Sequence, residues 1–172
     1  MIPAATGADE RQPDRNARRA ARLAAVQAIY QMELTGVDAE QVVAEFAEHR
    51  FGRETELAPA GPPDEEFFGD LVRGVPHHQR EIDRAIAGAL AAGWKLQRID
   101  SILRAILRAA AYELIARHDV PAKVVIDEYL EIAHAFFEGD EEGFVNAVLD
   151  RVARRKRAVE FGETPPDDEL QF

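Results

Sequence analysis

Residues 98–117 read RIDSILRAILRAAAYELIAR, and this stretch decides the fold. Its apolar side chains recur every three or four residues, so on a helix they cover a broad face and not a narrow stripe. The members of this face are Ile99, Ile102, Leu103, Ile106, Leu107, Ala110, Leu114 and Ile115. We therefore expect a central helix with other helices packed around it.

The segments on both sides of this stretch also have helical patterns. Helices are predicted over residues 15–35, 38–49 and 64–93, with a kink or break at Pro76, which lacks a backbone donor. Further helices are predicted over residues 119–139 and 140–157. No segment shows the alternation of apolar and polar residues that is typical of a half-buried strand. The sequence therefore predicts an all-α fold, a compact bundle of about seven helices.

The composition favours one cytoplasmic domain with a local binding site. The chain has 172 residues, 47% of them hydrophobic, and no apolar run near the ~18 residues that a membrane-spanning helix needs. It has no cysteine, which excludes disulfides and thiolate metal sites and fits a reducing cytoplasm. A net charge of −11 argues against nucleic-acid binding by the whole surface.

Three segments are expected to lie outside the packed helices of the domain, which covers residues 15–158. Residues 1–14 contain prolines and a glycine and are predicted to form a flexible N-terminal extension. Residues 50–63 are rich in glycine and proline, which predicts a mobile loop. Residues 159–172 are acidic and are predicted to form a disordered tail.

A cationic helix end stands out in this acidic chain. Arg15, Arg18, Arg19 and Arg22 are spaced so that they share one face of the first predicted helix, with no acid between them. Cations at a helix start oppose the macrodipole, so local stability does not explain these arginines. They indicate either a site for a polyanion or a solvated face, and the spacing alone leaves both open.

The start of the last predicted helix combines an aromatic residue with acids. Phe144 directly follows an acidic loop, residues 138–143, that includes Glu138, Asp140 and Glu141. A phenylalanine in this position can stack on an unpaired base or fill the core. The acids can dock a basic partner, or only provide the negative charge that a helix start favours.

Signals for catalysis or metal binding are weak. His77 and His78 are adjacent, so on a helix they point about 100° apart and cannot chelate one ion together. Residues Asp127, Glu128 and Glu131 are interpreted as solvated surface. There is no phosphate-binding glycine loop and no nucleophile elbow. We expect no enzyme activity, no cofactor and no metal.

Four motifs together resemble those of the bacterial transcription antitermination factor NusB family. They are RRAARLAAVQAIY at residues 18–30, LRAAAYEL at 107–114, DVP at 119–121 and FVNAVLD at 144–150, in the order of the family. The resemblance implies two packed helical subdomains. It also implies binding of the single-stranded boxA element of nascent ribosomal RNA together with ribosomal protein S10, as part of the RNA polymerase antitermination complex. A homodimer is a further possibility that it raises.

The resemblance also implies roles for individual residues. The arginines of residues 18–22 match an arginine-rich motif that contacts RNA, and Tyr30 matches the tyrosine that closes the helix of this motif. Arg104 falls where the family often has a basic residue, and Phe144 matches a phenylalanine near bound RNA. The resulting RNA-binding set is Arg15, Arg18, Arg19, Arg22, Tyr30, Arg104 and Phe144, and the partner-binding set is Glu138, Asp140 and Glu141.

Two other classes of protein compete with this interpretation. One is a non-enzymatic helical adaptor, in which the arginines are only solvated surface and the acidic loop binds a protein. The other is a NusB-like domain fused to an RNA methyltransferase, which we discount because the chain has no glycine-rich cofactor loop. If the arginines bind RNA, we expect Arg18, Arg19 and Arg22 to point to solvent without a full set of carboxylate partners.

Overall fold

A computed structural model describes residues 14–51 and 62–165. Seven α-helices and two short 3₁₀ helices make up these residues, and no strand occurs among them. The α-helices are α2 (Arg15–Thr35), α3 (Ala39–His49), α4 (Glu65–His77), α5 (Gln79–Ala89), α6 (Ser101–Ala116), α7 (Ala122–Phe136) and α8 (Glu141–Lys156). The 3₁₀ helices are η1 (Leu96–Arg98) and η2 (Ala158–Phe161). The predicted all-α fold class is confirmed.

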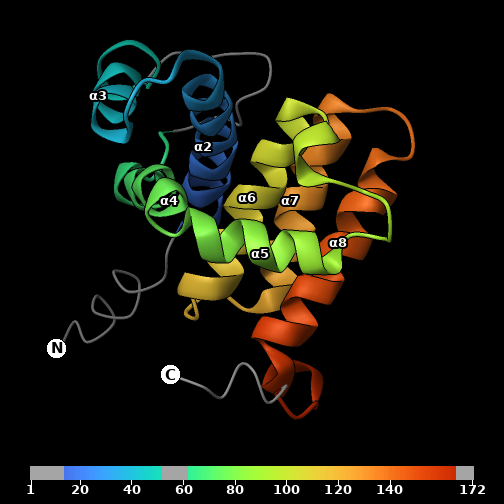
Figure 1. The fold of residues 1–172 in the computed structure, drawn as a ribbon. Coiled ribbons are helices and arrows are strands. Elements are labelled where there is room, and N and C mark those ends of the chain that lie inside the picture. The colour runs from blue at the N-terminus through green and yellow to red at the C-terminus, as the bar shows by residue number, and fades with distance from the viewer. Residues whose placement is uncertain (1–13, 52–61, 166–172) are drawn as a thin grey trace, which may run out of the picture.

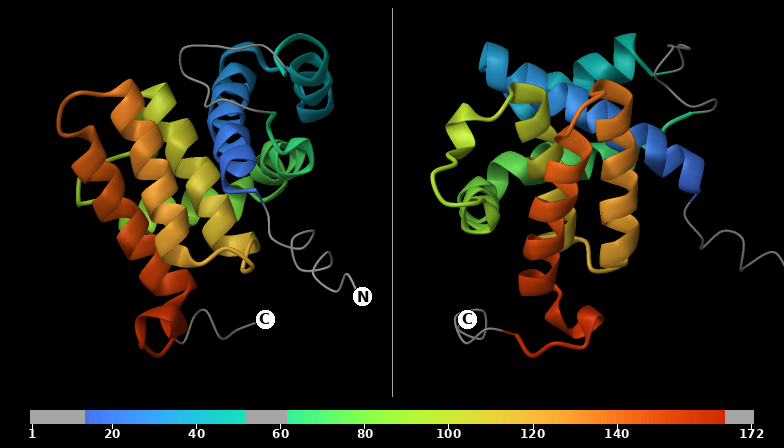
Figure 2. Two further views of the ribbon diagram at one scale, coloured as in Figure 1. Left: turned by 180° about the vertical axis from the view of Figure 1, so that it is seen from behind. Right: turned by 90° about the vertical axis from the view of Figure 1, so that its right-hand side faces the viewer.

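Helix α6 lies at the centre of the molecule, as its broad apolar face predicts. Ile106 and Leu107 are fully buried, and α6 packs against α2 and α4 on one side and α5, α7 and α8 on the other. Figure 1 shows α6 surrounded by these helices. The helices therefore form two groups, α2–α4 and α5–α8, which meet along α2, α4 and α6 (Figure 2).

Local sequence signals set the helix ends. The Asp14 carboxylate accepts hydrogen bonds from the backbone N–H groups of Asn16 and Ala17, and so caps α2. Gly36 ends α2 in the left-handed conformation, with φ of +73°. The predicted break at Pro76 is also confirmed, because α4 ends at His77 and α5 begins at Gln79.

The predicted boundaries of the irregular segments need two corrections. Most of the expected extension, loop and tail lies outside the described residues, namely 1–13, 52–61 and 166–172. Phe51, at the start of the expected loop, packs edge-on against Phe68, with ring centroids 4.9 Å apart. At the expected start of the tail, η2 is folded because the Glu160 carboxylate accepts hydrogen bonds from the Ala122 backbone N–H and from Arg157.

No helix in the described parts of the chain is long and apolar enough to cross a bilayer.

Candidate nucleic-acid interface

The four arginines at the start of α2, which we call the arginine face, are Arg15, Arg18, Arg19 and Arg22. Arg22 lies deepest, with only 3% of its surface exposed, and forms two hydrogen bonds of 2.9 Å with the fully buried Glu113 of α6. Burial alone lowers the pKa of the Arg22 guanidinium, but the hydrogen bonds and charge of Glu113 raise it above its usual range. The expectation that Arg22 points unpaired to solvent is wrong, because the helix turns this position toward α6.

Arg19 is paired with α7 but remains partly accessible. Its Nε and Nη2 atoms donate to the Glu128 carboxylate at 3.0 and 3.1 Å, and Nη2 lies 3.4 Å from an oxygen of Glu131. The hydrogen bond to Glu128 raises the pKa of Arg19. Glu128 is buried, so its interpretation as solvated surface is wrong, whereas Glu131 is exposed. The Arg19 side chain is 42% exposed, so a ligand at the surface of α2 can contact it.

Arg18 has weaker carboxylate contacts than its two neighbours. Its guanidinium lies over the Phe67 ring, 4.5 Å from the centroid, and 3.8 and 3.6 Å from oxygens of Asp64 and Asp119. Its Nε atom makes no hydrogen bond with the described residues. Arg15 is exposed. The arginine face therefore passes from an exposed first residue to a buried ion pair within two turns.

Arg104 donates hydrogen bonds to main-chain carbonyl groups just before the start of α6. Its Nη1 atom donates to the carbonyl of Ile99 at 2.7 Å and to that of Leu96 at 3.2 Å, and its Nη2 atom bonds the Glu33 carboxylate. The side chain is almost completely buried. The expectation that Arg104 serves RNA does not fit this placement, because its donors fix η1 and α2 against α6.

An opening of about 380 Å³ lies beside the second half of α2. Its lining includes Tyr30 and Leu34 of α2, Ile102 of α6 and Phe136, the last residue of α7. Tyr30 is half-buried there, and Leu34 is largely exposed. Because α7 ends at Phe136, this opening is close in sequence to the acidic loop.

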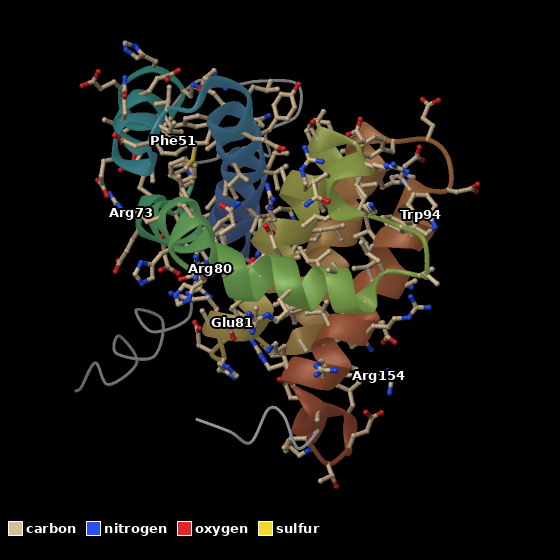
Figure 3. All side chains as sticks on the ribbon, viewed as in Figure 1. Phe51, Arg73, Arg80, Glu81, Trp94 and Arg154 are labelled. Carbon is tan, nitrogen blue, oxygen red and sulfur yellow. The ribbon has the colours of Figure 1, made fainter. Side chains whose placement is uncertain are left out.

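An aromatic pair lies beyond the acidic loop. Phe144, in the first turn of α8, packs against the ring of Trp94, with centroids 5.6 Å apart and an angle of 36° between the planes. Phe144 is half-buried, and Trp94 is 56% exposed. Figure 3 shows Trp94 at the edge of the molecule, beside the start of α8. Gly93 has a φ of +91°, and this left-handed residue shapes the turn that carries Trp94.

The acidic loop presents two of its three predicted acids to solvent. Glu138 and Asp140 are exposed, and Glu141 is half-buried with its carboxylate accepting a hydrogen bond from the Gly139 N–H at 3.1 Å. The Asp140 side chain makes no capping hydrogen bond to α8. These acids therefore remain available next to Phe144.

Comparison with known proteins identifies the family. A match to the NusB family covers residues 19–154, which is most of the described chain. The chain belongs to the NusB family. The transcription antitermination protein NusB of Caulobacter vibrioides is 54% identical over 140 residues, which cover 81% of this chain and 94% of that relative.

Solved structures agree with this assignment. The structure of T. maritima NusB is 31% identical, has a TM-score of 0.66, and covers 90% of this chain and 97% of its own. A structure of antitermination factors NusB and NusE in complex with dsRNA has a TM-score of 0.68 at 23% identity, with coverage of 82% and 98%, and shows a shared fold. The two packed helical subdomains predicted from the NusB resemblance are thus confirmed.

In this NusB-family chain, only part of the predicted site is accessible. The exposed or partly exposed members of the predicted sets are Arg15, Arg18, Arg19, Tyr30, Phe144, Glu138, Asp140 and Glu141. Arg22 and Arg104 are buried. The sequence analysis missed Trp94, although a single tryptophan after a glycine, between two predicted helices, is a recognisable signal.

Proposed function

We propose that this chain binds the single-stranded boxA element of nascent ribosomal RNA together with ribosomal protein S10, within the RNA polymerase antitermination complex. The observation that carries the proposal is an aromatic pair with an exposed tryptophan ring, Trp94, in a chain whose helix α2 also presents accessible arginines. Stacking on aromatic rings favours unpaired bases, whereas arginines bind the phosphates that join them. A cytoplasmic location, where this RNA is made in bacteria, is part of the proposal.

The charges of the chain support a division of work, in which this chain and S10 bind the RNA together. A net charge of −11 repels RNA at long range, and two of the arginines already have bidentate carboxylate partners. The exposed acids Glu138 and Asp140 suit a basic partner beside Phe144. NusE, which is S10, accompanies NusB and RNA in the solved complex of the related fold. No finding supports a homodimer, so self-association is not proposed.

The proposal is tested by titrating fluorescent boxA RNA with the full chain, with and without S10, at several salt concentrations. We expect weak binding by the chain alone and clearly tighter binding with S10, with a linear fall of log affinity against log salt. A boxA RNA of permuted sequence is the control for specificity. Equal RNA affinity with and without S10 would contradict the division of work. S10 binding without any RNA binding would favour the helical adaptor.

A further inference from the structure

A second basic surface lies between α5 and the end of α8. The last two turns of α8 contain Arg151, Arg154, Arg155 and Lys156, and they face the small residues Ala85, Gly88 and Ala89 of α5 across a groove of about 360 Å³. Figure 3 shows Arg154 at this end of α8, below α5. We call this opening the basic groove.

Several cations in this region already have contacts within the fold. Arg157 is buried and donates to the carbonyls of Glu113, Leu114, Arg117 and Val120, so it ties the end of α6 to the start of α7. Cations in the last turn of a helix are also favoured by its dipole, but Arg151 lies a full turn earlier. Arg154 pairs with Asp150 and Glu163, and Lys156 lies 3.7 Å from Glu81. All four cations nevertheless remain in the lining of the groove.

The lining of the basic groove suits an anionic ligand. Among its lining residues Glu163 is the single acid, and it is already paired with Arg154 at 2.6 Å. On the α5 side, a Cβ built at Gly88 would meet no atom within 4 Å, so a ligand can approach the helix backbone closely. In a chain of charge −11, this concentration of cations favours phosphate groups over neutral ligands.

The basic groove and the aromatic pair are linked through the same helix, α8. Arg151 donates through Nη1 to the carbonyl of Ala89 at 2.8 Å, and only residues 90–93 separate Ala89 from Trp94. Along α8, positions 144, 147, 151 and 155 follow each other at steps of three or four, which places them on one stripe of the helix. The stripe is about 17 Å long at the usual rise of an α-helix.

We propose that the basic groove between α5 and α8 binds the phosphates of the same RNA strand whose unpaired base stacks on Trp94 and Phe144. This inference rests on the proposed RNA-binding function and adds the path that the RNA strand follows on the protein. The strand leaves the aromatic pair along α8, so nucleotides flanking the stacked base contribute to affinity.

Opposite substitutions at Gly88 test the groove without disturbing the core, because a Cβ at this position would meet no atom within 4 Å. Gly88→Glu places a negative charge in the groove and Gly88→Lys a positive one of similar length. With S10 present, we expect Gly88→Glu to weaken binding of boxA RNA with flanking nucleotides on both sides and Gly88→Lys to strengthen it. For each phosphate that the groove no longer binds, the salt slope should flatten by about 0.7, so the deficit shrinks about 2.6-fold between 50 and 200 mM salt. Equal affinities of the two variants would overturn the proposal.

Removal of a groove cation provides a second test with a matched control. Arg151→Ala and Arg73→Ala each remove one positive charge, but Arg73 is exposed on α4, where it pairs with Glu40. We expect only Arg151→Ala to reduce the affinity for the flanked RNA, whereas boxA RNA without flanking nucleotides binds both variants alike. Equal affinities of both variants for the flanked RNA would contradict the groove.

The outcomes separate this inference from the function on which it rests. If the unaltered chain with S10 binds no boxA RNA, the proposed function fails. If it binds RNA and the Gly88 and Arg151 variants bind this RNA as tightly as the unaltered chain, only the proposal for the basic groove fails. If these variants change the affinity for S10 in the absence of RNA, the groove is a protein contact and the proposal is overturned.

Discussion

The arginine face of α2 and the aromatic pair beside α8 differ in how far their side chains are already engaged. In the arginine face, Arg22 and Arg19 each use two donors on a carboxylate of another helix. In the aromatic pair, Trp94 makes its ring contact with Phe144 and leaves more than half of its surface exposed. Arginines that are close together in the sequence can thus be paired with carboxylates in the fold. The exposed part of the Trp94 ring, in contrast, stays accessible to a ligand.

This difference divides the site into a part that mainly supports the fold and a part that is ready for a ligand. Arg22 links α2 to α6, and Arg19 links α2 to α7, so both hold the two groups of helices together. A phosphate can compete for Arg19 at the surface, but cannot reach Arg22 without disrupting the core. Substitutions along this gradient, from the buried pair to the surface, should therefore affect stability first and RNA binding second.

The largest effect is expected for Arg22→Ala. The substitution leaves the Glu113 carboxylate buried without its partner, and breaking a buried pair in this way costs about 3–5 kcal/mol. Urea unfolding should show this loss in the free energy of unfolding. The double variant Arg22→Met with Glu113→Leu should recover most of the loss, because no unpaired charge remains. Normal stability combined with weak RNA binding in Arg22→Ala would instead make Arg22 an RNA ligand.

The second effect concerns the aromatic pair. Trp94→Ala should weaken boxA binding by about 1–3 kcal/mol, because stacking on an aromatic ring contributes about this much per base. The salt slope should stay the same, since the substitution leaves every phosphate contact in place. Val159→Ala is the control, because Val159 is also an exposed apolar side chain but lies on η2. An unchanged RNA affinity for Trp94→Ala would remove the aromatic pair from the site.

The helical fold could be predicted from local patterns, because each pattern acts within one element. The broad apolar face of residues 98–117 predicted a central α6, and Pro76 predicted the break after α4. The start of α2 is equally local, because the Asp14 carboxylate accepts hydrogen bonds only from N–H groups two and three residues ahead. The folded start of the expected tail was missed, because Glu160 is held by Ala122, 38 residues away.

The state of the arginine face could not be predicted in the same way. The partner of Arg22 is 91 residues away and that of Arg19 is 109 residues away, so the spacing of the arginines contains no information about them. Glu128 is assigned to the surface when α7 is considered alone, but it is buried once α2 packs beside it. The structural role of Arg104 similarly depends on its hydrogen bond to η1, a short helix that no periodic pattern in the sequence indicates.

A smaller effect is expected from releasing Arg19. Glu128→Gln removes the negative charge that competes with RNA for this guanidinium. We expect tighter binding of boxA RNA with S10, and a salt slope steeper by about 0.7 if Arg19 gains one phosphate contact. Glu40→Gln is the matched control, because it also removes one negative charge and frees an arginine, Arg73, on α4. Equal gains in both variants would show a general charge effect and no role for Arg19.

The smallest effect is confined to high pH and lies next to the arginine face. The Tyr112 hydroxyl donates to Asp70 at 2.9 Å, and burial together with this hydrogen bond raises the pKa of Tyr112 to about 12. The same tyrosine titrates near pH 10 when the chain is unfolded. Between these values the unfolded chain releases a proton that the folded chain retains, so the free energy of unfolding decreases as the pH rises.

Tyr112→Phe isolates this contribution, because it keeps the ring that fills the space above Gly74 and removes only the hydroxyl. Below about pH 10, the unaltered chain should be more stable than the variant by about 1 kcal/mol, the usual contribution of one hydrogen bond. A pKa raised from 10 to about 12 corresponds to more than this contribution of about 1 kcal/mol, so the difference should disappear between pH 10 and 12 and then reverse in sign. Urea unfolding of both chains across this range measures it, and Tyr129, whose pKa is also raised by burial, contributes equally to the two. A difference that stays constant with pH would show that the Tyr112 proton is not held by the fold.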